Sequence, residues 1–162
     1  MKSDFNKALI LFQSRKLNEA KNICEEILKE EKNNSQVYNL YAFVLHSFKD
    51  FDEAIINFNH AIKINPNYIE AYNGRGNALI KLQKFDEAII NFNQALKINP
   101  NYFEAYNNLG SALIKLEKFD EAIINFNQAL KIKPSSAEAY HGKGYALMKS
   151  LKFDEAIINF NQ

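Results

Sequence analysis

A nine-residue sequence, FDEAIINFN, occurs four times in this chain at a constant spacing of 34 residues. The copies begin at Phe51, Phe85, Phe119 and Phe153. A fixed period of this length predicts a repeat protein, in which each unit buries its apolar face only against its neighbours. We therefore divide the chain into frames 1–34, 35–68, 69–102, 103–136 and an incomplete 137–162, and we number the places in each frame from its first residue.

Two helices are predicted in each frame, and we call them helix A and helix B. In frame 69–102 small or apolar residues recur at helical spacing in helix A, at Tyr72, Gly76 and Leu79. After a polar link the spacing returns in helix B, at Ala88, Phe92, Ala95 and Leu96. Proline then stops helix B, because it lacks an amide hydrogen and disfavours helical geometry in the preceding residue. The three prolines are Pro66, Pro100 and Pro134, one period apart.

This pattern resembles the tetratricopeptide repeat family, a helix-turn-helix unit of 34 residues. The family has an aromatic and a small residue on helix A, then small, aromatic and small residues on helix B and a closing proline. Frame 103–136 has Tyr106, Gly110, Ala122, Phe126, Ala129 and Pro134 at these places. The resemblance implies an all-α fold, a right-handed superhelical solenoid of antiparallel helix pairs, with residues 1–162 forming one array.

The first frame departs from the pattern. It has Cys24 where the other frames have phenylalanine, and Lys32 where they have proline. Two registers are open for its first helix. In one, Asp4 and Lys7 occupy core places. In the other, the helix is moved by one residue and the packed stripe is Phe5, Ala8, Leu9 and Phe12.

The last frame stops inside helix B, at Gln162. It lacks the closing residues and the polar capping helix that many repeat arrays carry. We expect either that the array continues in a longer protein, or that this end contacts a partner, such as a second copy of the chain.

The overall charge and composition argue against several classes of partner. The 20 basic and 19 acidic side chains leave a net charge of +1, so we expect no binding to nucleic acid or to an anionic membrane surface. No apolar run is long enough for a membrane span, and the N-terminus does not resemble an export signal. With a single cysteine, a cytoplasmic protein is predicted.

No catalytic, metal or cofactor site is predicted. His46, His60 and His141 fall in different frames without the spacing of metal ligands, and no phosphate-binding loop or nucleophile motif occurs. Cys24 replaces a core phenylalanine and is expected to be a buried, inert thiol. We expect His60 to be a solvated surface residue.

The resemblance implies that helix A lines a concave face where extended peptides or helices bind. Its inward places predict a protein or peptide site at Asn39, Phe43, Asn73, Asn77, Lys81, Asn107, Asn108, Ser111, Lys115, His141, Tyr145 and Lys149. Asparagine suits this role, because a side-chain amide can pair with any peptide main chain. The open alternative is an ordinary solvated face, since lysine near a helix C-terminus is also favoured by the helix dipole.

Helix B carries an isoleucine two residues after each small alanine. At about 100° per residue, this place lies roughly 200° around the helix from the alanine. The isoleucines, Ile56, Ile90, Ile124 and Ile158, are therefore expected on the convex side. They predict either a surface for self-association or a second partner, or isolated exposed side chains.

The predicted function is a non-catalytic protein-protein interaction module or scaffold. Two alternatives are open. The chain could be the targeting segment of a longer enzyme, such as a glycosyltransferase, or a self-associating structural element that forms a homo-oligomer through its C-terminal end or its isoleucines.

Overall fold

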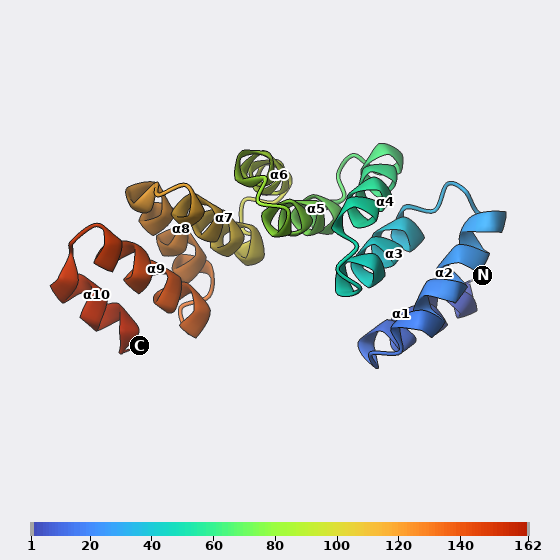
Figure 1. The fold of residues 1–162 in the computed structure, drawn as a ribbon, viewed down its shortest axis with the longest axis horizontal. Coiled ribbons are helices and arrows are strands. Elements are labelled where there is room, and N and C mark those ends of the chain that lie inside the picture. Colours follow the sequence, from blue (N-terminus) through green and yellow to red (C-terminus); the bar gives the residue numbers. More distant parts are fainter. Residues whose placement is uncertain (1, 162) are drawn as a thin grey trace. The chain divides into compact units, whose positions relative to one another are not determined.

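A computed structural model describes the backbone of residues 2–161 and the side chains of residues 4–161. Within these residues every regular element is an α-helix (Figure 1), so the predicted all-α class is confirmed. Each frame contributes two helices. They are α1 (Lys2–Gln13), α2 (Leu17–Glu30), α3 (Ser35–Ser47), α4 (Phe51–Ile64), α5 (Ile69–Lys81), α6 (Phe85–Ile98), α7 (Phe103–Lys115), α8 (Phe119–Ile132), α9 (Ala137–Lys149) and α10 (Phe153–Phe160).

The helices form two compact units, Met1–Leu82 with α1 to α5 and Gln83–Gln162 with α6 to α10. Within each unit every helix packs against the next one along the chain. Successive A helices also touch: α3 contacts α1 and α5 in the first unit, and α7 contacts α9 in the second. Each unit therefore presents a row of neighbouring A helices.

The turn between helix A and helix B contains a left-handed residue in every frame. Arg15, Lys49, Gln83, Glu117 and Leu151 all occupy place 15, and their φ angles lie between 58° and 66°. This conformation costs a residue other than glycine roughly 1–2 kcal/mol. Because five different side chains adopt it, the packing of the two helices, and not the residue type, determines the turn.

The helix ends follow the sequence signals. The B helices α4, α6 and α8 end at Ile64, Ile98 and Ile132, each two residues before a proline. At the N-terminus of α3, Asn34 Oδ1 accepts a hydrogen bond from Val37 N at 3.1 Å. Ser136 Oγ accepts one from Ala139 N at 3.3 Å and caps α9 in the same way.

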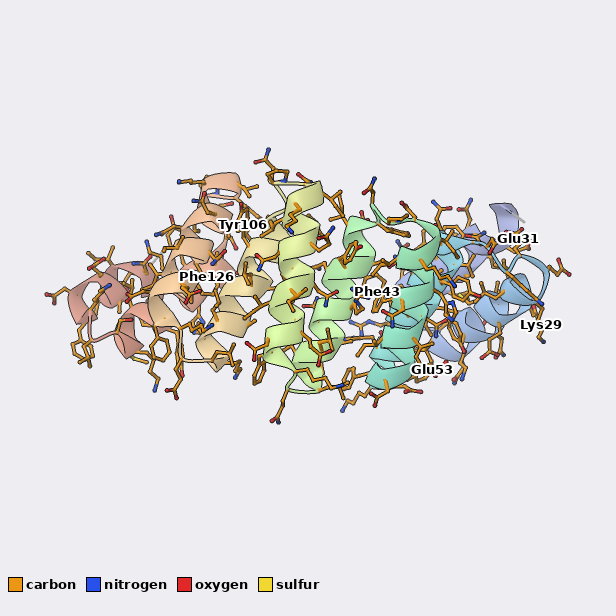
Figure 2. All side chains as sticks on the ribbon, turned by 90° about the horizontal axis from the view of Figure 1, so that it is seen from above. Lys29, Glu31, Phe43, Glu53, Tyr106 and Phe126 are labelled. Atoms are coloured by element: carbon orange, nitrogen blue, oxygen red, sulfur yellow. The ribbon has the colours of Figure 1, made fainter. Side chains whose placement is uncertain are left out.

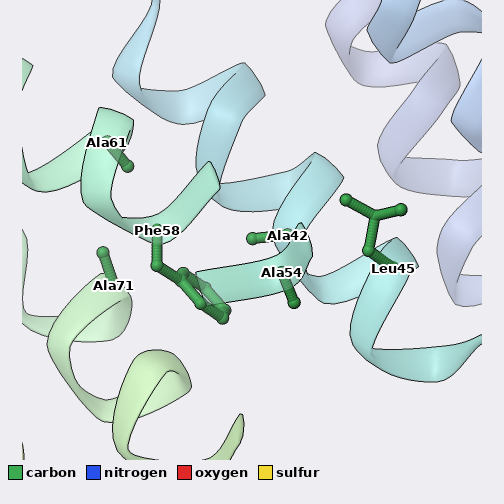
Figure 3. Close-up of a cluster of buried hydrophobic side chains, with 6 residues drawn as sticks. All are labelled: Ala42, Leu45, Ala54, Phe58, Ala61 and Ala71. Atoms are coloured by element: carbon green, nitrogen blue, oxygen red, sulfur yellow. The ribbon is translucent and has the colours of Figure 1, made fainter. Parts of the chain in front are cut away.

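One core cluster of the first unit is built around the ring of Phe58 (Figure 3). Small residues allow the three surrounding helices to approach it. They are Ala42 on α3, Ala54 and Ala61 on α4, and Ala71 on α5, and all are fully buried. Gly74 on α5 lies directly against this ring: a Cβ there would come within 2.6 Å of Phe58 Cε1. Close helix contact therefore depends on small residues at these places.

The first helix adopts the second of the two registers considered above. Ala8 is fully buried, and Phe5, Leu9 and Phe12 pack against a cluster that includes Cys24 and Val37. Asp4 and Lys7 are exposed. The packed stripe of α1 is thus apolar and small, as in the other A helices.

The second unit repeats this packing around Phe126, which is 1% exposed (Figure 2). Its ring lies against Gly110 on α7 and Gly142 on α9. The same octapeptide, FDEAIINF, forms α10, but no described helix covers its outer side. Phe160, the equivalent of Phe126, is accordingly 44% exposed.

Candidate functional site

The fifth place of helix A holds an asparagine in three frames, and all three side chains are buried. Asn39, Asn73 and Asn107 are only 8%, 8% and 4% exposed. A peptide lying on helix A would meet the more exposed side chains at places nine and thirteen before it reached these amides. The asparagines therefore form the floor of any binding surface, not its rim.

Two of these asparagines have an amide oxygen without a hydrogen-bond donor. Asn39 Oδ1 and Asn107 Oδ1 are buried and accept no hydrogen bond from the described residues. Burial raises the pKa of Tyr68, the charge of Glu70 raises it further, and the nearby Asn39 side-chain amide lowers it. A buried acceptor without a donor costs roughly 1–3 kcal/mol, so the packing around these two side chains must offset that cost.

The other candidate residues of the first unit differ in accessibility. Phe43 is half-buried, and its ring meets that of Phe58 edge-on with 5.1 Å between the ring centres. Asn77 is also half-buried, while Lys81 is exposed at the end of α5. Phe43 therefore contributes to the core as well as to the helix-A surface.

His46 lies at the twelfth place of α3 in an apolar setting. Its Nε2 atom is buried and has no hydrogen-bond partner among the described residues. Its ring meets that of Phe51 edge-on at 5.1 Å. Burial lowers the pKa of His46, and the charge of Lys81 lowers it further, so the neutral ring is the form that the fold favours.

Stability should therefore fall in mildly acidic solution because of His46. The unfolded chain binds a proton near pH 6.5, the usual pKa of histidine, while the folded chain binds it only at lower pH. The contribution of the neutral His46 side chain to the free energy of unfolding is thus fully present above pH 6.5. It is lost as the pH falls below that value. Urea denaturation at a series of pH values should show this decrease. His46→Ile, which matches Ile80 and Ile114 at the same place, should reduce it.

The exposed His60 provides the control for this experiment. His60→Gln reproduces Gln94 and Gln128 at the equivalent place and is the matched single-histidine variant for comparison. Equal pH profiles for wild type and His46→Ile would contradict the assignment.

The candidate residues on the A helices of the second unit are mostly exposed. Asn108 is half-buried, whereas Ser111, Lys115, His141, Tyr145 and Lys149 are exposed or partly exposed. Lys149 Nζ lies 5.6 Å from the centre of the Tyr145 ring, and the His141 ring lies 5.6 Å from that of Phe160. Ser111 Oγ donates to the Asn107 carbonyl oxygen at 3.0 Å. This face offers cations, an aromatic hydroxyl and an imidazole to a ligand.

The isoleucines on the opposite side of the B helices are exposed. The exposed fractions are 46% for Ile56, 68% for Ile90, 59% for Ile124 and 61% for Ile158. Each of these side chains leaves much of its apolar surface in water. Their role as a contact surface stays a prediction.

Neither Cys24 nor His60 lies in surroundings that suggest a chemical role. Cys24 is fully buried, and burial raises the pKa of its thiol to about 12, which leaves it protonated and unreactive. The exposed His60 stacks on Tyr38 with 4.9 Å between ring centres. Among residues 2–161 no three histidine, cysteine, aspartate or glutamate side chains gather as metal ligands would.

One pairing between consecutive frames was not predicted from the sequence. The residue at place 7 of helix A reaches the residue at place 25 of the preceding helix B. Tyr41 donates its hydroxyl hydrogen to Glu25 Oε1 at 2.6 Å, and Arg75 Nη1 donates to Asn59 Oδ1 at 2.5 Å. Burial raises the pKa of Tyr41, and the hydrogen bond with Glu25 adds to this effect. The sequence holds no clear signal for this pairing, because place 25 is asparagine at Asn59, Asn93 and Asn127 while place 7 of the next helix is arginine, leucine and lysine.

Three overlapping stretches of the chain match the model of one repeat family. The model describes the tetratricopeptide repeat (TPR) and matches residues 44–83, 76–117 and 110–150, which is more than half of the chain. The chain belongs to the tetratricopeptide repeat family. TPR repeats generally mediate protein-protein interactions, and TPR proteins are generally non-catalytic.

Solved structures of other TPR proteins share the fold of this TPR chain. A crystal structure of MamA is 23% identical, with a TM-score of 0.87, covering 95% of this chain and 90% of MamA. MamA from Desulfovibrio magneticus is 21% identical, with a TM-score of 0.89, covering 99% and 90%. The thermophilic TPR protein TTC0263 of Thermus thermophilus is 18% identical, with a TM-score of 0.81, covering 99% and 88%. The predicted TPR-type superhelical solenoid is thereby confirmed as the fold class.

A comparison with curated protein sequences found no significant match. No helix among residues 2–161 combines the length and the apolar composition needed to cross a membrane.

Proposed function

We propose that this TPR chain is a non-catalytic module that binds an extended or helical segment of another protein on the A helices of its repeats. The observation that carries the proposal is the row of exposed polar and aromatic side chains on neighbouring A helices of the second unit. They are Ser111 and Lys115 on α7 and His141, Tyr145 and Lys149 on α9. Because hydroxyl, ammonium and imidazole groups can pair with a peptide main chain and its side chains, an extended segment is a suitable partner.

The exposed residues of the same helices would select the partner. In the second unit, Lys115 and Lys149 favour a segment that carries carboxylates. Tyr145 and His141 add aromatic surface close to these charges. Within each unit the proposed surface keeps the residues of the sequence prediction, with the buried asparagines of place five as its floor. We also propose that the module acts in the cytoplasm, since its one cysteine is free and buried.

The test compares two triple variants of the full chain in quantitative capture from native lysate. The site variant carries His141→Ala, Tyr145→Ala and Lys149→Ala, three changes on α9. The control variant carries Ile56→Gln, Ile90→Gln and Ile158→Gln, three exposed changes on the B helices. We expect the site variant to lose at least one interactor that the control retains. Identical interactors for the site variant and wild type would refute the helix-A site.

A second candidate function, self-association, is favoured by the exposed isoleucines. The same control variant tests it in sedimentation-velocity ultracentrifugation. If a homo-oligomer forms through these side chains, the control variant sediments as a smaller species than wild type. An unchanged sedimentation coefficient over a range of concentrations would remove this candidate.

A further inference from the structure

At the first two junctions between consecutive frames, the residue at place 7 of helix A is hydrogen-bonded to the residue at place 25 of the preceding helix B. The α2/α3 junction is closed by the hydrogen bond from Tyr41 to Glu25, and the α4/α5 junction by the hydrogen bond from Arg75 to Asn59. The Arg75 guanidinium also lies over the Tyr72 ring, 5.4 Å from its centre. Polar side chains of the protein itself therefore satisfy one another at these two junctions.

The α8/α9 junction is different. Its equivalent residues are Lys143 and Asn127, and no hydrogen bond joins them among the described residues. They line a hollow of about 480 Å³ instead. The other lining residues are Ile124, Gln128, Leu130, Lys131 and Tyr140.

The lining of this hollow has positively charged groups and no negatively charged ones. It contains two lysine ammonium groups, Lys131 and Lys143, a tyrosine and two side-chain amides, but no carboxylate. Neither lysine takes part in an ion pair within the described part of the chain. Donors therefore outnumber acceptors, and two positively charged side chains line the hollow without a carboxylate in its lining.

The first junction shows a carboxylate held by the side chain at place 7. There the residue at place 25 is Glu25, whose carboxylate accepts from Tyr41 and lies 3.8 Å from Lys21 Nζ. The later junctions all lack this carboxylate, because place 25 is Asn59, Asn93 or Asn127, and the fourth junction is the one with a lysine at place 7. A carboxylate supplied from outside would provide the missing acceptor.

We propose that the hollow between α8 and α9 binds an acidic segment of a partner protein, with a glutamate or aspartate side chain between Lys131 and Lys143. Ile124, which is 59% exposed, and Leu130 receive an apolar side chain next to the acidic one. This surface lies on helix B and on the side of helix A that faces it. It is a second site, separate from the helix-A residues proposed above.

A short fluorescein-labelled peptide of alternating glutamate and leucine is the probe, and fluorescence anisotropy measures its binding to the full chain. Lys131→Glu with Lys143→Glu should weaken binding about tenfold or more. The matched control, Lys63→Glu with Lys97→Glu, changes the net charge equally at the places equivalent to Lys131 and should bind as wild type does.

A third variant, Asn127→Glu, separates loss of the site from loss of the fold. It recreates the carboxylate of the first junction, so it should fill the hollow from within and abolish peptide binding without lowering the melting temperature. Lys143 then has a counter-charge on its own chain.

The proposal fails if wild type does not bind the glutamate peptide, if the pocket variants bind as wild type does, or if the control loses as much affinity. It also fails if a phosphoserine-leucine peptide binds and the glutamate peptide does not, since the ligand is then a phosphate. Equal binding of a lysine-leucine peptide would overturn it as well, because apolar contact alone would then explain the binding.

Discussion

Phe126→Ala is expected to lower the free energy of unfolding by about 3–5 kcal/mol. The Phe126 ring is 1% exposed and fills the space between α7 and α9. A Cβ at Gly110 or Gly142 would lie 2.8 Å or 2.5 Å from its Cζ atom, and the glycines have no side chain to fill the cavity that truncation leaves. Urea denaturation followed by circular dichroism measures the loss.

Phe160→Ala is the matched control for this prediction. The residue occupies the same place of an identical octapeptide, but 44% of its surface is already in water. Its truncation removes less burial and should cost only about 1–2 kcal/mol. Equal losses for the two variants would show that stacking by the following helix is not what stabilises Phe126.

Gly74→Ala is expected to destabilise the first unit by about 1–3 kcal/mol, although alanine is the better helix former. Helix propensity alone predicts a gain of about 1 kcal/mol. Steric overlap outweighs it, because the new Cβ would lie 2.6 Å from Phe58 Cε1 and 3.0 Å from Phe43 Cζ. Phe58 is fully buried and cannot move aside without disturbing the surrounding alanines.

A compensating change tests this explanation. Phe58→Leu removes the atoms that the new methyl group would meet, so Gly74→Ala should cost less in that background than in wild type. Thermal denaturation of the two single variants and the double variant gives the coupling. A stabilising effect of Gly74→Ala in wild type would mean that the helices separate freely at this junction.

The helices could be predicted from the sequence because two independent signals agreed. The apolar spacing indicated which residues of each helix face its partner, and the prolines indicated where α4, α6 and α8 end. The first helix was ambiguous, since α1 has no aromatic residue at place four. The choice depended on contacts with α2 and α3, around Cys24 and Val37, which spacing within α1 does not contain.

The candidate site was less predictable. The period of helix A shows which face holds Asn39 and Asn107, but not how deeply neighbouring helices bury them. Their burial and their unsatisfied oxygens depend on side chains from other elements, such as Tyr68. The pairing of place 7 with place 25 was missed because it joins residues of two frames, whereas the spacing within one frame does not contain it.

The left-handed residue at place 15 offers a position where the stability of this protein can be changed without changing its proposed binding surfaces. All five frames accept the conformational penalty at that turn with an ordinary side chain. None of these residues belongs to either proposed binding surface. Glycine adopts this conformation without the penalty, so replacing the residue at place 15 by glycine should raise thermal stability. The substitution can be made in one turn or in several.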